Sequence, residues 1–486
     1  MDEFKRMSGI KNLEIFLIII YLTSIMKNLY IQLILISVCL SIFFNLTAQT
    51  DKASEIKFCP QNYIPDSLPN LGLSFVKGAE TVLLYDTPEN RSEYNQPHLG
   101  TFSHHSHITL FNNIIVATWS NHYGDEDSPG QYIRYSISKD GGKSWQNPDT
   151  NVKSGTEFGA VLFPPMEKPL RNPQPRNADG DKINNLNNPL QAYRPHDKCG
   201  SGKSGNSKSD ENDNCGHYHL EMCANGFALA DGRLFAIAEI AKGINNPGIG
   251  RVVREIKKDG KPGDVFWLNE DVPDLEEITP NAINVELYNN KQYNSEIVLK
   301  LIAYLKNPLH MPQWDFYHKG WIQADGKKAK DWNAIDGAAG TCEPTYAYSI
   351  GKGVYARLWR TKAKWLYAQF SYDKGKSWTE VERTSIPDCG SRANAGNLPD
   401  GRSYVINNVY PDGRNPLVIS LSDDGKLFNK AYVIRSGDPG TKNELGRAKV
   451  NGFQYPHSVI SGNYLVVMYS INKESIAVTR LALKQL

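Results

Sequence analysis

A short turn pattern occurs three times in this chain and constrains its fold more than any other feature. "SISKDGGKSW" and "SYDKGKSW" place Ser, Asp, Gly and Ser at alternate positions before Trp145 and Trp378, and a weaker copy runs from Leu421 through Asp423 to Phe428. In such a turn Asp bonds the backbone, Gly accepts a positive φ and the aromatic side chain packs beneath. The last two copies are about 50 residues apart, the length of one four-stranded unit. The pattern therefore predicts a chain built from repeated small antiparallel sheets.

A second pattern supports the same fold. An apolar strand, a turn of Gly, Asn or Asp, and another apolar strand follow one another in five segments: 108–120, 226–240, 347–360, 397–409 and 458–470. Each reads as a β-hairpin. Because no long helical period appears, we predict an all-β chain, a single β-propeller of seven blades with four antiparallel strands each. An array of β-sandwiches is the alternative.

The N-terminus holds two apolar runs. Residues 26–48 combine a lysine, an apolar stretch and small residues around Ala48, which is typical of a secretory signal peptide. Residues 1–25 would then precede the signal peptide and follow from an upstream start codon that is not used. Residues 49–486 are expected to form the propeller. A membrane hairpin is the alternative, although the first run is too short to span a bilayer. The mature protein is expected to be exported, periplasmic or secreted, and without a membrane span.

Six cysteines remain after the leader, an even number that favours disulfides in an exported chain. Cys199 and Cys215 bracket a polar insertion near 196–216, and a disulfide there would contribute roughly 3 kcal/mol. Zinc is the alternative, because His196-x-x-Cys199 and Cys215-x-His217 have the spacing of zinc ligands. The expected chemistry requires no cofactor, and a structural zinc or calcium ion would be compatible with it.

Four of the eleven histidines flank the first hairpin, in "FSHHSHITLFNNIIVATWSNH". Histidine titrates near neutral pH, so this group could transfer protons, bind a metal or have neither role. Pairing about Asn112-Asn113 places His105 near Ser120 and His104 near Asn121 and His122. We therefore expect His104, His105 and His122 to be neighbours and His107 to be structural. Proton transfer is favoured, and no catalytic metal is expected.

Polar residues precede the other hairpins as well. If the hairpins are the two inner strands of successive blades, the residues before the first strand and after the second share one face, where a site is expected. The residues placed at this mouth of the channel are His104, His105, Tyr218, His219, Glu343, Arg392, Tyr455 and His457. The repeated turns that contain Ser, Asp and Gly are expected to lie on the opposite face.

Cationic residues join this set. Arg251 and Arg254 follow a Gly-rich loop and point to opposite faces of their strand. Further candidates are Arg360, Arg414 and Lys449. The formal net charge of +2 argues against a dedicated nucleic-acid binder. Arginine collected beside His and Tyr suits an anionic oligosaccharide or polysaccharide instead.

The repeated turn resembles the Asp box, or BNR repeat, of sialidase-like β-propellers, where it is structural and lies far from the active site. The segments "RNPLVISLSDDGKLF" and "FQYPHSVISGNYLVVMYSINKESI" are similar to the closing blades of bacterial carbohydrate-active members. Sialidases use an arginine triad, a Phe/Tyr-Arg-Ile-Pro motif, a Tyr/Glu nucleophile pair and an acidic Asp. The chain departs from this pattern in "NYIPDS", Asn62 to Ser67, which lacks the arginine.

The His, Tyr and Arg set resembles that of propeller ulvan lyases and of an ulvan-oligosaccharide dehydratase of marine Bacteroidetes. The resemblance implies β-elimination on a uronic-acid-containing glycan, which either dehydrates the non-reducing-end uronate or cleaves a 4-linked chain. The developing enolate must be stabilised while one group removes the C5 proton and another protonates the leaving oxygen. One of His104, His105 and His122 is expected to supply base and acid together with Tyr218 or His219. Arg251 is expected to neutralise the carboxylate. The residues expected to bind substrate are Arg254, Arg360, Arg392, Arg414, Lys449, Tyr455 and His457.

Two other functions fit the sequence. A sialidase-like glycoside hydrolase needs paired carboxylates, which Glu126-Asp127, Glu239 and Glu343 could supply. A non-catalytic glycan-binding propeller needs none of these groups to react.

Overall fold

A computed structural model describes residues 56–87, 100–122, 126, 129–146, 160–168, 220–242, 248–268, 274–279, 281–289, 295–310, 341–442 and 449–486. The chain divides into two units, Met1–Ser54 and Glu55–Leu486, and every described residue lies in the second. The predicted signal peptide and the predicted insertion at 196–216 lie outside the described residues. No helix in the described part is long and apolar enough to cross a membrane.

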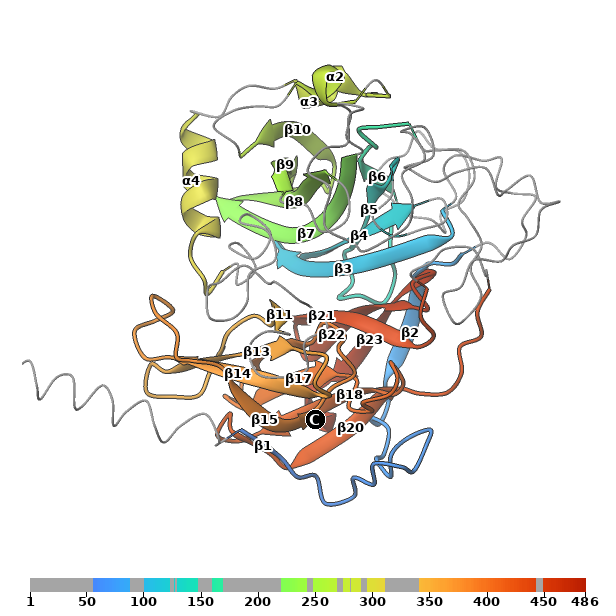
Figure 1. Cartoon of the computed structure of the whole chain (residues 1–486), viewed down its shortest axis with the longest axis vertical. Helices are drawn as coiled ribbons and strands as arrows, with labels where there is room; N and C mark the ends of the chain where they lie inside the picture. Colours follow the sequence, from blue (N-terminus) through green and yellow to red (C-terminus); the bar gives the residue numbers. More distant parts are fainter. Residues whose placement is uncertain are drawn as a thin grey trace, which may run out of the picture. The chain divides into compact units, whose positions relative to one another are not determined.

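Antiparallel sheets of four strands are the repeating element (Figure 1). The first contains β3 (Phe102–Phe111), β4 (Ile114–His122), β5 (Tyr132–Ser138) and β6 (Ala160–Phe163), in sequence order. The second contains β7 (Leu220–Ala230), β8 (Arg233–Lys242), β9 (Gly248–Ile256) and β10 (Pro262–Trp267), again in sequence order. Both begin with one of the hairpins that the sequence predicts.

Three further sheets follow the same plan. The third is formed by β11 (Cys342–Pro344), β12 (Tyr348–Ser349), β13 (Tyr355–Arg360), β14 (Trp365–Ser371) and β15 (Glu382–Pro387). The fourth is formed by β16 (Asn394–Asn397), β17 (Ser403–Asn407), β18 (Leu417–Ser422) and β20 (Lys430–Arg435). The fifth is formed by β21 (Phe453–Ser461), β22 (Tyr464–Ile471), β23 (Ser475–Ala482) and β2 (Glu80–Tyr85), so an early strand completes the last sheet. A short parallel pair joins β1 (Lys57–Phe58) to β19 (Leu427–Phe428).

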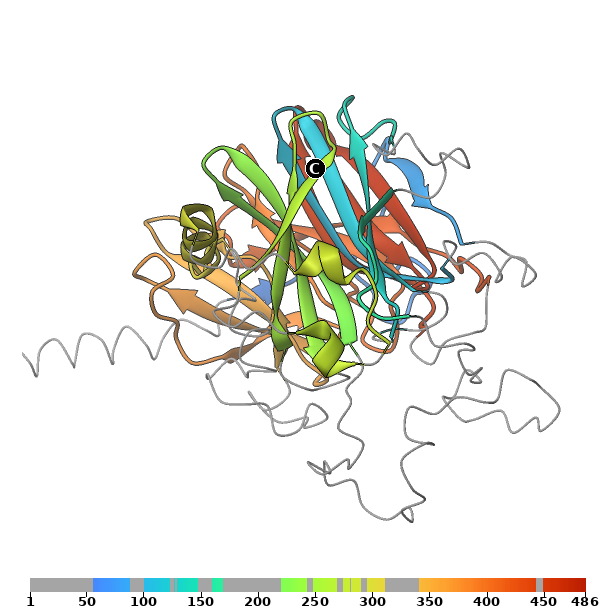
Figure 2. The ribbon, with the colours of Figure 1, turned by 90° about the horizontal axis from the view of Figure 1, so that it is seen from above.

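The first strands of the sheets lie next to one another. β3 contacts both β7 and β21, and β16 contacts β12 and β21. Figure 2 shows β3 and β4 running beside the strands of the last sheet. Apolar side chains fill the space between sheets, as Val116 and Leu162 of the first sheet do with Met222 and Ile240 of the second. Five sheets of four or more strands occur in the described residues, and the predicted number of seven blades stays a prediction.

All five predicted hairpins are confirmed. The turn of the first has positive φ at both Asn112 and Asn113, the geometry that matches the twist of its strands. The repeated turn connects the third and fourth strands of a sheet. In its first copy Asp140 accepts hydrogen bonds from the amides of Lys143 and Ser144.

The third copy of this turn corrects the prediction by one residue. Ser422 donates to Asp424, which accepts from the amides of Lys426 and Leu427. The predicted residue, Asp423, instead lies 3.9 Å from the ammonium of Lys430.

The sequence patterns do not predict the helices. α2 (Leu275–Ile278) and α3 (Val285–Tyr288) are single turns. α4 (Glu296–Leu305) is capped at its N-terminus by Ser295, whose hydroxyl accepts from the amide of Val298. α4 buries Val298, Leu301 and Leu305 against the second sheet. This helix has only ten residues, too few to show a clear period among so many strands.

The disulfide prediction is wrong for three of the cysteines. Cys59, Cys342 and Cys389 are free thiols. Compartment and an even number of cysteines do not by themselves determine pairing. The predicted Cys199–Cys215 bridge and the alternative zinc site lie outside the described residues.

Candidate functional site

The inner strands of four sheets carry a β-bulge at equivalent places. The pairing register shifts between His104 and His107 on β3, between Ala224 and Phe227 on β7, at Glu343 on β11, and between Gln454 and His457 on β21. At each bulge one residue has a positive φ: His105 (54°), Gly226 (94°), Glu343 (42°) and Tyr455 (55°). Such a backbone costs about 1–2 kcal/mol for a residue other than Gly and redirects its side chain. Backbone strain of this kind concentrates at functional sites.

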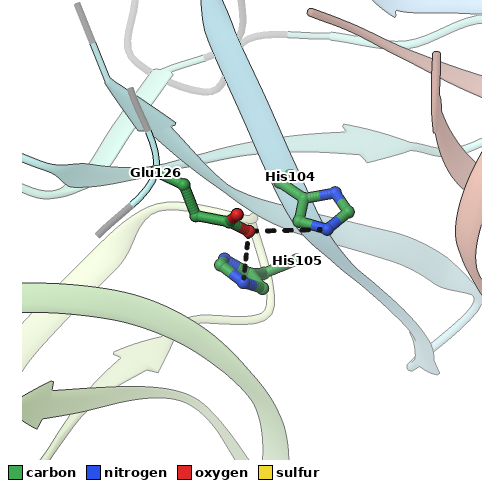
Figure 3. A group of neighbouring side chains, drawn as sticks. All are labelled: His104, His105 and Glu126. Carbon is green, nitrogen blue, oxygen red and sulfur yellow. Dashed lines mark ion pairs between the residues drawn. The ribbon is translucent and has the colours of Figure 1, made fainter. Parts of the chain in front are cut away.

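His104 and His105 are adjacent residues whose rings both face Glu126 (Figure 3). The Nε2 atoms lie 3.7 Å and 3.5 Å from the same oxygen, Glu126 Oε1. The other carboxylate oxygen, Oε2, accepts from the ammonium of Lys473 at 2.5 Å. Two imidazoles, a carboxylate and an ammonium thus form one cluster, in which the Glu126 side chain is the most exposed, at 16%.

Serine hydroxyls hold the opposite nitrogens of both rings. His104 Nδ1 lies 3.1 Å from Ser470 Oγ, and His105 Nδ1 lies 3.1 Å from Ser120 Oγ. Ser120 also accepts from the amide of Ala224 at 2.9 Å, which ties the second sheet to the site. The Nε2 atoms of both rings are therefore the ones directed at the centre.

Tyr455 lies beside these histidines and binds a second carboxylate. Its ring centroid is 3.9 Å from that of His104, and its hydroxyl donates to Glu343 Oε2 at 3.0 Å. Glu343 Oε2 also forms an ion pair with Arg360, whose Nε lies 2.6 Å away.

Three guanidinium groups surround the Tyr455 ring. Those of Arg360, Arg392 and Arg414 lie 5.6, 4.9 and 5.8 Å from its centroid. Together with Lys473 they give the site four cationic groups against the carboxylates of Glu126 and Glu343. Such a surplus of positive charge favours an anionic ligand.

Burial and these charges set the protonation states. Burial lowers the pKa of His105 to about 4 and that of His104 well below its usual value, so both rings are neutral near pH 7. Burial alone would raise the pKa of Glu126 and Glu343, but Lys473 beside the first and Arg360 beside the second lower it, so both carboxylates are ionised. Burial raises the pKa of Tyr455 well above 10, so its phenol keeps its proton.

A second pair of histidines, His107 and His457, lies next to Arg392. The ring centroids of His107 and His457 are 5.2 Å apart, and Tyr346 lies 5.2 Å from His457. Arg392 Nη1 is 3.4 Å from His107 Nε2, and His457 Nδ1 accepts from the amide of Ile108. The contact with His107 and a hydrogen bond to the carbonyl of Ser106 position Arg392.

Other predicted residues have partners elsewhere. Arg251 pairs through Nε with Glu239 at 2.6 Å on neighbouring strands, and Arg254 donates to the carbonyls of Gly263 and Leu162. Lys449 pairs with Glu474 at 3.2 Å, and His122 Nε2 lies 3.1 Å from the carbonyl of Pro129. The structure therefore brings His104, His105, Tyr455 and three arginines together, and it places Arg254 in the scaffold. Tyr218 and His219 lie outside the described residues.

The bulge in β3 corrects the predicted register. His104 lies opposite Ser120, and Phe102 opposite His122, one residue away from the expected pairs. The sequence prediction of the site also omits Lys473, Ser120 and Ser470. Lys473 could have been found, because it follows β22, the second strand of the last hairpin, and residues after the second strand are predicted to face the site. Ser120 and Ser470 lie within the second strands β4 and β22 and carry no such signal.

Comparison with known proteins supports the fold. Residues 303–467 match the family described as a BNR repeat-like domain. A sialidase structure aligns with 88% of the chain at 22% identity and a TM-score of 0.61, and the chain spans 35% of that sialidase. The NanB sialidase of Streptococcus pneumoniae aligns with 86% of the chain at 12% identity (TM-score 0.44), over 72% of its own length. A Dyadobacter fermentans protein of unknown function aligns with 84% of the chain at 14% identity (TM-score 0.40), over all of its own length.

No curated protein matches the chain. The chain thus contains a BNR repeat-like region and has a sialidase-like all-β fold. At this level of identity the likeness establishes the fold, and the chemistry has to be argued from the site itself.

Proposed function

We propose that this protein is a lyase that performs β-elimination on a uronic-acid-containing glycan, with ulvan oligosaccharides as the preferred substrate. The observation that carries the proposal is the position of Tyr455, whose ring has His104 against it and three guanidinium groups around it. Elimination needs a proton acceptor, a proton donor and a group that neutralises the uronate. This cluster contains all three.

The arginines would bind the uronate carboxylate. Arg392 and Arg414 are the better candidates, because Arg360 is already committed to Glu343. Neutralising the carboxylate makes the C5 proton more acidic, since negative charge develops on the carboxylate as that proton leaves. A planar guanidinium matches a carboxylate through two parallel hydrogen bonds.

His105 is the better candidate for the base. Its side chain is 10% exposed, whereas that of His104 is fully buried. The imidazole would take the C5 proton, and the C–H electron pair would form the C4–C5 double bond as the C4–O4 bond breaks. Tyr455 would give its proton to the departing oxygen, which leaves as a sugar hydroxyl or as water. Proton transfers of this type contribute about 10²–10⁴-fold each.

The test is incubation of the purified protein with ulvan oligosaccharides, followed by absorbance of the conjugated unsaturated uronate and by mass spectrometry. A rise in absorbance is expected. Loss of one water without chain cleavage identifies a dehydratase, and shorter products identify a chain-cleaving lyase. Saturable binding with no product would overturn the proposal in favour of a glycan-binding protein.

A sialidase-like hydrolase is the second candidate, favoured by the hydrogen bond from Tyr455 to Glu343. An ionised Glu343 could accept the phenol proton while Tyr455 attacks an anomeric carbon, as in the Tyr/Glu pair of sialidases. This reaction also needs a general acid. Glu126 and Glu343 are poor candidates for it, because both carboxylates are ionised and carry no proton to donate. Products that gain water and show no unsaturation would select this candidate.

The glycan substrate and the leader predicted at 26–48 fit an exported protein that degrades polysaccharide fragments outside the cytoplasm. Fractionation of cells that express the full chain tests this location.

A further inference from the structure

We propose that His104, His105 and Glu126 form a binding site for a divalent transition-metal ion such as Zn²⁺. The two Nε2 atoms and a carboxylate oxygen lie within 4.8 Å of one another (Figure 3). Two imidazoles and one carboxylate are a ligand set that Zn²⁺ and its neighbours accept, with further positions open to water or a ligand.

The distances are unsuited to hydrogen bonds. A hydrogen bond from an imidazole to a carboxylate spans about 2.7–3.2 Å, whereas Glu126 Oε1 lies 3.7 Å and 3.5 Å from the two Nε2 atoms. Ligand atoms about 2.1 Å from a tetrahedral ion are about 3.4 Å apart. His104 Nε2 is fully buried and has no hydrogen-bond partner, which is costly for a ring nitrogen unless something binds it.

The surrounding residues orient the rings as a metal site requires. Metal-binding imidazoles usually donate their other N–H to a fixed acceptor. Ser470 and Ser120 occupy that place at the Nδ1 atoms of His104 and His105, each at 3.1 Å. Lys473 in turn holds the second oxygen of Glu126. Both rings thus direct Nε2 toward the same carboxylate oxygen, Glu126 Oε1.

The cations nearby set the strength of binding. Lys473 neutralises Glu126 and occupies Oε2, and it repels a dication together with Arg392 and Arg414. Removing the ammonium would remove one repulsive charge and its hydrogen bond to Oε2. We therefore expect Lys473→Met to tighten metal binding and Glu126→Gln to weaken it. A structural cluster with no affinity for metal would show neither effect.

The site has a consequence for catalysis that depends on the proposed function. An ion on His105 Nε2 occupies the nitrogen that would accept the C5 proton, so metal binding and turnover would exclude each other. Metal binding itself is independent of the reaction and can be measured on the protein without substrate. Failure of the activity assay and failure of the metal site can therefore be told apart.

The test uses the full chain in a Cys59→Ser background, because Cys59 is an exposed thiol that could bind metal by itself. After chelation and desalting, Zn²⁺ is titrated by calorimetry and Co²⁺ by visible absorption, which reports the coordination geometry. We expect a site that Glu126→Gln and His104→Ala each weaken at least tenfold and that Lys473→Met tightens about tenfold, whether or not a second ion binds at the residues of the 196–216 insertion. His310→Ala, at an exposed histidine stacked on Tyr304, is the matched control and should bind as the parent does.

Circular dichroism of each variant establishes that it is folded. If Glu126→Gln does not fold, the tighter metal binding expected of Lys473→Met still tests the proposal. The absence of Zn²⁺ and Co²⁺ binding in the parent would overturn the proposal. So would affinities that Glu126→Gln, His104→Ala and Lys473→Met leave unchanged, because the metal would then bind elsewhere.

Discussion

Tyr455 donates a hydrogen bond to Glu343 across 112 residues of sequence, and both residues have a left-handed backbone. Each is the bulged residue of the inner strand of its sheet, as His105 is on β3. The fold therefore uses the same local distortion in three sheets to direct a polar side chain to one centre. The strain at each position is retained because the flanking hairpin pairs determine the backbone on both sides.

Removing the Tyr455 hydroxyl should abolish turnover and leave the fold intact. We expect Tyr455→Phe to lower kcat at least 100-fold, because the phenol is the proposed proton donor in elimination and the nucleophile in hydrolysis. Steady-state rates on the active oligosaccharide measure the loss. Tyr464→Phe, at a tyrosine on β22 outside the cluster, is the control. A kcat in Tyr455→Phe equal to that of the control would contradict both proposed reactions.

The bulge at His105 predicts a difference between two variants that both remove the imidazole. His105→Gly relieves the positive φ, whereas His105→Ala keeps the strain. We expect both to be inactive and the glycine variant to be more stable than the alanine variant by about 1 kcal/mol. Urea unfolding of the two proteins gives this difference directly. Equal stabilities would mean that the strand relaxes out of the left-handed conformation.

The shifted third copy of the repeated turn gives a matched pair of substitutions. Asp424→Ala removes the acceptor of two backbone amides and should lower the free energy of unfolding by about 1–2 kcal/mol. Asp423→Ala removes only a long surface ion pair and should change stability by less than about 0.5 kcal/mol. Thermal unfolding of both variants decides between them. A larger loss of stability in Asp423→Ala than in Asp424→Ala would instead support the register that the sequence pattern predicts, with Asp423 in the turn.

Asp388 should make stability fall as pH rises. Burial raises its pKa to about 7, above the value of about 3.8 in an unfolded chain, so the folded state holds this proton longer. Between about pH 4 and pH 7 the unfolded state loses the proton first, and stability declines by up to about 1.4 kcal/mol per pH unit. Asp388→Asn removes this contribution, so its stability relative to the parent should rise with pH over that window. Urea unfolding at several pH values measures the trend, and a difference that does not vary with pH would show that Asp388 is ionised when folded.

Local sequence determined the hairpins, their turns and the face on which polar groups gather. The Asn112-Asn113 turn and the Asp-containing turns are encoded by residues a few positions apart, so their chemistry can be read directly. Residues before the first strand and after the second strand of each hairpin were predicted to share one face. This prediction placed five residues at one site: His104, His105, Glu343, Arg392 and Tyr455. These predictions succeed because alternation and turn residues act over short distances.

Tertiary structure decided what those residues do to one another. The contacts of His104 with Ser470 and of Glu126 with Lys473 join segments more than 300 residues apart. The bulge that shifts the register of β3 against β4 by one residue directs His105 to the same cluster. No pattern within a strand specifies such pairs, since they depend on how neighbouring sheets pack their inner strands. The sequence by itself therefore determined the repeated sheets and a polar face. Only packing decided which imidazole faces which carboxylate, because burial and the distances between charges exist only once the sheets are assembled.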